Sequence, residues 1–128
     1  MKRSIWICLF FISVSVLFSN KAVAQKDETN KAVLVINAVV DQEHKQEVQR
    51  YLSQMMQIFK DNGGKPLGRY KTIEKINGSQ LPEMIAIVSF ETADTIKKML
   101  AGDDYTSLSE LRERVFSDLK IVVCTELN

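Results

Sequence analysis

The side chains that could carry chemistry in this chain are few and well separated. His44 is the only histidine, which excludes a metal centre built from several imidazoles of one chain. We therefore expect no metal site and no cofactor. His44 precedes Val48 by one turn of a predicted helix. It is a weak candidate for a general base, has still less support as a haem ligand, and is otherwise a half-buried residue at a helix start.

Tyr105 and Arg112 form the second candidate group. They are seven residues apart, so they share one side of a helix if that helix begins as early as Tyr105. A hydroxyl and a guanidinium could then be presented together to an acidic ligand. The alternative is a packed tyrosine beside a solvated or salt-bridged arginine.

Tyr70 and Glu74 lie on one face of a polar predicted strand, and Arg69 lies on the other. If the Tyr70 face points into an apolar enclosure, Glu74 is a carboxylate suited to acid/base chemistry. If it points outward, Glu74 is an ordinary charge on a sheet edge.

Two polar residues, Asn37 and Ser89, interrupt otherwise apolar strands and are further candidates for a pocket. The sequence contains no glycine-rich phosphate loop, nucleophile elbow or zinc-ligand spacing. The weak catalytic candidates are therefore Glu74, Tyr105 and His44, and the weak ligand-binding candidates are Asn37, Tyr70, Ser89 and Arg112.

The N-terminal segment has the pattern of a secretory signal peptide. Lys2 and Arg3 precede an apolar run over residues 5–18, and Ala22-Val23-Ala24 is a small-residue cleavage site. The alternative, an uncleaved membrane anchor, needs about 18 to 20 consecutive apolar residues. We expect a signal peptide over residues 1–24, a polar tether over 25–32, one domain over 33–128, and export to the periplasm or medium. Contact with a membrane is expected only during export.

Charge and cysteine content limit the partners of the exported chain. Three of the 17 Lys and Arg residues lie in the first 24 positions, so 14 basic side chains remain against 16 acidic ones. This balance argues against a nucleic-acid partner. Cys124 is then the only cysteine, which rules out an intrachain disulfide. Its apolar surroundings in the sequence predict a buried thiol.

Hydrophobic periodicity predicts three elements in the first half of the domain. Residues 33–40 form a strand that is apolar on both faces. Asp41 then caps a helix over 42–62, with an apolar stripe at Val48, Leu52, Met55 and Phe59 and a stop at Gly63-Gly64. A polar strand over 65–76 suits a sheet edge.

The second half repeats this order. After a turn at Asn77-Gly78-Ser79, residues 84–90 form another strand that is apolar on both faces. A helix over 92–101 stops at Gly102, and a further helical segment follows Tyr105, where Ser107 and Glu110 have capping-box spacing. Residues 119–126 form the last strand.

The order strand, helix, strand, strand, helix, strand predicts an α+β, ferredoxin-like fold, with an antiparallel sheet whose first and third strands are central. Helices cover one face of such a sheet and leave the apolar residues of the other face exposed. A two-fold homodimer that encloses a barrel between two sheets, the dimeric α+β barrel, would cover them.

Several short segments also resemble a known family. They are Asn62-Gly63-Gly64, Ser89-Phe90-Glu91 and the run from Asp103 to Leu108, together with Glu74, Gly78, Pro82, Ala93 and Arg112. In these segments the chain resembles the bacterial family of unknown function DUF1330. The resemblance implies the dimeric α+β barrel fold, whose superfamily includes small monooxygenases, isomerases and haem-dependent enzymes.

Three functions follow as expectations. The first is an exported protein that binds a small, largely apolar molecule or acts as an accessory module. The second is a cofactor-independent monooxygenase or isomerase acting on a small aromatic-type substrate, with Glu74, His44 or Tyr105 moving a proton. The third is a structural self-association module. Convergence of Glu74 and Tyr105 on one enclosed cavity would favour the enzyme.

Overall fold

A computed structural model describes residues 31–79 and 81–127 of the chain. The predicted signal peptide, its cleavage site and nearly all of the tether lie outside the described residues. Within the described part, no helix combines the length and apolar character needed to cross a membrane.

Four antiparallel strands form one sheet in the order β2-β3-β1-β4. The strands are β1 (Ala32–Val40), β2 (Lys65–Lys71), β3 (Met84–Phe90) and β4 (Phe116–Thr125). The two most apolar strands, β1 and β3, occupy the centre, because a central strand is covered on both edges and excludes charged side chains. This order confirms the predicted ferredoxin-like topology.

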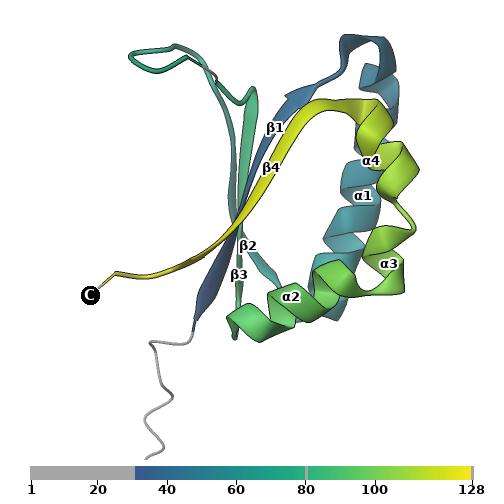
Figure 1. Ribbon diagram of the computed structural model, residues 1–128, viewed down its shortest axis with the longest axis vertical. Coiled ribbons are helices and arrows are strands. Elements are labelled where there is room, and N and C mark those ends of the chain that lie inside the picture. Colours follow the sequence, from purple (N-terminus) through teal and green to yellow (C-terminus); the bar gives the residue numbers. More distant parts are fainter. Residues whose placement is uncertain (1–30, 80, 128) are drawn as a thin grey trace, which may run out of the picture.

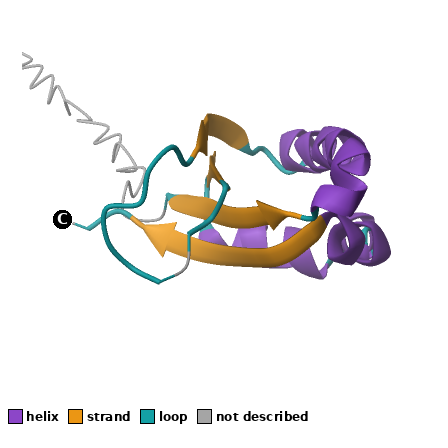
Figure 2. Ribbon diagram, turned by 90° about the horizontal axis from the view of Figure 1, so that it is seen from above, coloured by secondary structure: helices purple, strands orange, loops and turns teal. Residues whose placement is uncertain are grey.

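The helices all lie on one side of the sheet (Figure 1). Seen from above, most of the helical turns lie beside the strands (Figure 2). A short 3₁₀ helix, η2 (Gln42–His44), leads into α1 (Lys45–Asp61), and α2 (Ala93–Ala101), α3 (Asp103–Thr106) and α4 (Ser109–Val115) follow β3. We call the sheet face that they cover the helix side and the opposite one the helix-free face.

The core lies between the sheet and the helices. Leu34, Ile96 and Val115 have the largest fully buried side chains. On α1 the buried residues are Tyr51, Met55, Ile58 and Phe59. Two residues of the predicted stripe, Val48 and Leu52, are only partly buried against this core. The helix ends where Gly63 adopts φ 76°, a left-handed conformation that glycine takes without a steric penalty.

The polar second strand is shorter than predicted. It was expected over residues 65–76, but β2 ends at Lys71. The backbone N–H of Thr72 still donates to the carbonyl of Glu83 at 3.0 Å. The chain then leaves the sheet, and the described residues 73–79 and 81–82 form no helix or strand. Proline at position 82 lacks an N–H and cannot continue a ladder of hydrogen bonds.

The second helical region differs from the prediction in two ways. One helix was expected after Tyr105, but Ser107 and Leu108 separate α3 from α4. The expected capping box is wrong, because the Ser107 hydroxyl donates to the carbonyl of Asp104 at 3.0 Å. The last strand was expected from Leu119 but begins at Phe116, directly after α4.

Strand register defines the helix-free face. Directly paired residues of an antiparallel sheet point to the same side, and the buried Leu34 and Ala38 point to the helices. Residues at odd positions of β1 therefore point away, with their partners on β3 and β4. The apolar members of this face are Val33, Val35, Val39, Ile85, Ile87, Val122 and Cys124.

Candidate functional site

A pocket of about 340 Å³ opens between the sheet and α1. It receives side chains from all four strands and from α1, α2 and α3. Most of its wall is apolar, and this part includes Leu34, Ile36, Leu52, Met55, Phe59, Met84, Ala86, Val88, Leu100, Phe116 and Ile121. Such a wall selects ligands by shape and apolar surface.

The edge strand β2 shapes one rim of the pocket. Pro66 pairs with Val88 and Gly68 with Ile87, so the register shifts by one residue and Leu67 becomes the extra residue of a bulge. The hydroxyl and ring of Tyr70 pack against Gly68 so closely that a Cβ at this position would clash with them. The bulge thus brings Leu67 and the backbone of Gly68 to the pocket.

Tyr51, Tyr105 and Arg112 form a polar cluster beside the apolar wall. Both tyrosines line the pocket. The guanidinium of Arg112 lies 4.2 Å from the centre of the Tyr105 ring, and its Nη1 donates to the Tyr105 carbonyl at 3.3 Å. These contacts join α3 to α4 across the helix break. Two residues predicted from their spacing are therefore in contact, and Tyr105 reaches the pocket.

Tyr51 is a pocket-lining residue that sequence reasoning missed. Its side chain is only 5% exposed, and its ring packs edge-on against Phe116 with centroids 5.2 Å apart. Burial raises its pKa to about 12, the nearby Tyr105 adds to this rise, and hydrogen bonding and positive charge from Arg112 partly oppose it. Its position three residues after Val48 and four before Met55, on the apolar stripe, was the available signal.

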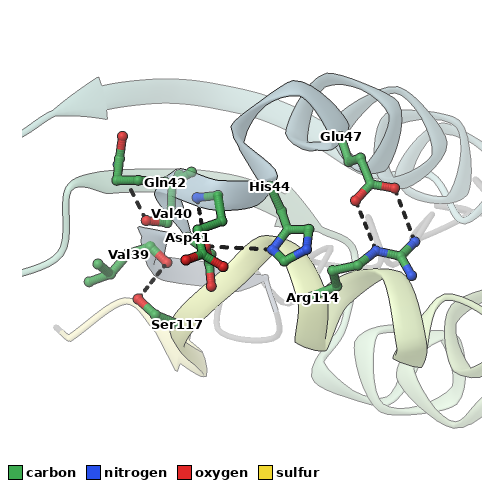
Figure 3. A network of polar contacts seen from close by, with 9 residues as sticks. Val39, Val40, Asp41, Gln42, His44, Glu47, Arg114 and Ser117 are labelled. Carbon is green, nitrogen blue, oxygen red and sulfur yellow. Dashed lines mark hydrogen bonds and ion pairs between the residues drawn. The ribbon is translucent and has the colours of Figure 1, made fainter.

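His44 lies away from the pocket, at the start of the helical segment (Figure 3). Its Nδ1 is 3.5 Å from Oδ1 of Asp41 but makes no hydrogen bond. The same Asp41 oxygen accepts from the backbone N–H of Glu43 at 2.8 Å, so Asp41 caps η2 as predicted. These three residues could offer a cation only one imidazole and two solvent-accessible carboxylates, a weak set for a transition metal.

An ion pair lies near His44 (Figure 3). Glu47 on α1 accepts two hydrogen bonds from Arg114 on α4, at 2.8 and 3.1 Å (Figure 3). Both side chains are partly exposed, so the pair contributes little to the free energy of folding. It joins α4 to the start of α1.

Glu74 and Tyr70 do not meet in the pocket. Glu74 lies in the exposed loop after β2 and Tyr70 is exposed on the strand. Tyr70 pairs with Ile85, which places it on the helix-free face. Glu74 and Tyr105 therefore do not converge on one enclosure within this chain, because β2 ends three residues before Glu74.

Asn37, Ser89 and Cys124 also belong to the helix-free face. Asn37 pairs with Ile85 and Lys120, and Ser89 pairs with Val33. The Ser89 hydroxyl donates to the carbonyl of Lys65 at 3.4 Å. The expectation of a buried Cys124 is wrong for the single chain, where the thiol is exposed, because no helix covers this side of β4.

Comparison with known sequences decides the family. A family profile described as a domain of unknown function, DUF1330, matches residues 31–126. The chain belongs to the DUF1330 family. This confirms the resemblance carried by the short segments. No match was found among curated proteins.

Solved structures show the same fold as this DUF1330 chain. A protein of unknown function from Rhodopseudomonas palustris has a TM-score of 0.63 at 11% identity, with 78% of this chain and 85% of that one covered. A dabb family protein with a ferredoxin-like fold from Mesorhizobium loti has a TM-score of 0.60 at 11% identity, covering 77% and 99%. A candidate antibiotic biosynthesis monooxygenase from Nitrosomonas europaea has a TM-score of 0.58 at 11% identity, covering 77% and 92%. Together they identify a ferredoxin-like fold of the dimeric α+β barrel class.

The buried phenol of Tyr51 predicts a pH-dependent stability. Between pH 10 and 12 the folded chain keeps the Tyr51 proton while the unfolded chain loses it, so the free energy of unfolding falls as the pH rises through this window. The loss is about 2 to 3 kcal/mol. Urea unfolding at pH 9, 10, 11 and 12 should show a shallower fall for Tyr51→Phe. Tyr70→Phe, at an exposed position, should keep the full fall, and equal slopes for all three proteins would contradict the prediction.

Proposed function

We propose that this domain binds one small, largely apolar molecule in the pocket between the sheet and α1. The supporting observation is the pocket itself, which has the size of small-molecule sites and an apolar wall drawn from both layers of the fold. Two tyrosines supply fixed polar groups at this wall. A pocket of this kind recognises a ligand through burial of apolar area, with few hydrogen bonds to orient it.

A cofactor-independent monooxygenase or isomerase is the second candidate function. It is supported by the fold shared with a candidate monooxygenase and by Tyr105, the one proposed proton-transfer residue that lines the pocket. Glu74 and His44 lie elsewhere in the chain. Of the three candidates for proton transfer, only the Tyr105 phenol is therefore available in the pocket. Because no candidate carboxylate or imidazole accompanies it there, we favour binding over catalysis.

We further propose that the protein is a homodimer joined through the helix-free face. This face has an apolar centre made of valines and isoleucines from three strands, including Val35 and Val122. The segment after β2, residues 73–79, bends to the same side of the sheet (Figure 1) and carries Ile73 and Ile76, which are 96% and 88% exposed. A second copy would cover the face, Cys124 and both isoleucines. If the pocket binds no ligand, the homodimer alone would make the protein a structural self-association module.

Export is proposed from the N-terminal pattern alone. A positive start, an apolar run and Ala22-Val23-Ala24 are the signals that signal peptidase requires.

Filling the pocket tests the binding function. Ala86 lines it, so Ala86→Phe should weaken binding of the neutral fluorescent probe N-phenyl-1-naphthylamine at least about tenfold by occupying its space. Leu67→Trp at the rim should also weaken binding without touching the core. Ala101→Phe, at an exposed helix position, is the control and should leave the dissociation constant unchanged. Undiminished binding by both pocket variants, with circular dichroism showing intact folds, would contradict the proposal.

A charge on the helix-free face tests the homodimer. Val122 is 48% exposed in the single chain and Met56, on α1, is 46% exposed, so Val122→Asp and Met56→Asp introduce the same charge at similar exposure. Sedimentation velocity should show a dimer for the parent protein and for Met56→Asp, and a monomer for Val122→Asp, because an unpaired buried carboxylate opposes association. A monomeric parent protein at 100 μM, about the concentration where a micromolar dimer is fully formed, would exclude the dimer.

N-terminal sequencing of protein recovered outside the cytoplasm tests export. The first residue should be Gln25, since cleavage is expected after Ala24. Protein that retains Lys2 and Arg3 would show that the segment is not removed.

A further inference from the structure

The hydroxyl of Tyr51 donates no hydrogen bond to any described residue of the chain. Tyr51 is buried and lines the pocket. Arg112 has donors only, so the hydrogen bond between them uses the Tyr51 oxygen as acceptor. No described residue accepts the remaining phenol proton. A buried donor without an acceptor costs free energy that a ligand can recover.

Neighbouring side chains fix the position of this donor. The edge-on contact with Phe116 orients the Tyr51 ring. Arg112 is itself held by the ring and the carbonyl of Tyr105, and no described carboxylate pairs with it. Because Arg112 occupies one side of the phenol oxygen, the proton must point elsewhere. Burial keeps this proton in place at neutral pH, since the pKa of Tyr51 is raised to about 12.

We propose that the pocket binds a neutral apolar molecule bearing a carbonyl group, and that the Tyr51 hydroxyl donates a hydrogen bond to that carbonyl oxygen. Arg112 is a positioning residue that directs the Tyr51 proton. This inference rests on the proposed binding function and names its ligand class. A carboxylate fits less well, because the Arg112 guanidinium does not line the pocket and Arg69, which does, is exposed on the β2 rim. A carboxylate beside one phenol in the apolar wall would be poorly compensated.

Three probes of one shape test the ligand class by equilibrium dialysis. Naphthalene measures the apolar pocket alone, 2-acetylnaphthalene adds a carbonyl, and 2-naphthoate adds a charge. The parent protein should bind 2-acetylnaphthalene about five- to tenfold more tightly than naphthalene, and 2-naphthoate more weakly than the ketone. Tyr51→Phe should abolish the preference for the ketone while naphthalene binding persists. Tyr70→Phe, at an exposed position, should retain that preference.

The outcomes separate this inference from the function on which it rests. If none of the probes binds, the pocket function itself fails. If naphthalene binds but the ketone gains nothing, or its gain survives Tyr51→Phe, the pocket stands and the carbonyl ligand is overturned. Tightest binding by 2-naphthoate would identify an acid as the ligand class, and loss of that binding in Arg69→Gln but not Arg50→Gln would place its carboxylate at the β2 rim.

Arg112→Gln tests the positioning role through the titration of Tyr51, which a purely packing role of Arg112 would not change. The ultraviolet titration of Tyr51 should shift to higher pH, because the variant loses the charge and hydrogen bonding that oppose the raised pKa. The ketone preference should shrink while naphthalene binding is retained. An unshifted titration together with an unchanged preference would remove Arg112 from the proposal.

Discussion

One constraint shapes this domain: four strands present apolar side chains on both faces of a sheet, while all the helices pack on one face. Leu34 and Ala38 of β1 are buried under the helices, whereas Val33 and Val35 of the same strand have none above them. Burial of apolar area is the main favourable term in folding and association. The helix side therefore supplies the core and the pocket, and the helix-free face supplies the proposed dimer interface.

The pocket exists because the covering layer is incomplete where it meets the sheet edge. The bulge at Leu67 and the absence of a side chain at Gly68 alter the rim. Tyr105, on the short helix α3, also lines the pocket. Close packing elsewhere, as around Ile96 and Val115, leaves little space. The proposed binding site thus lies beside local irregularities of an otherwise regular fold.

Arg112 and the two tyrosines near this pocket interact electrostatically with one another. Arg112 is half-buried and pairs with no carboxylate of the described residues. It stacks on Tyr105 and opposes the burial-driven rise of the Tyr51 pKa. A cation in such a place costs desolvation, which its contacts with an aromatic face and a carbonyl reduce. The arrangement keeps a protonated phenol at an apolar wall, a combination suited to orienting a neutral ligand.

The sequence by itself determined the order of elements and the central place of β1 and β3, because apolar residues on both faces of a strand require cover on both sides. It also pointed to Tyr105 and Arg112, although their spacing predicted one continuous helix and they meet instead across the break between α3 and α4. Tyr51 was hidden in an apolar stripe, where an aromatic residue usually signals core. Only the tertiary structure placed its hydroxyl beside Arg112, ended β2 before Glu74 and exposed Cys124, because these outcomes depend on which segments distant in sequence pack together.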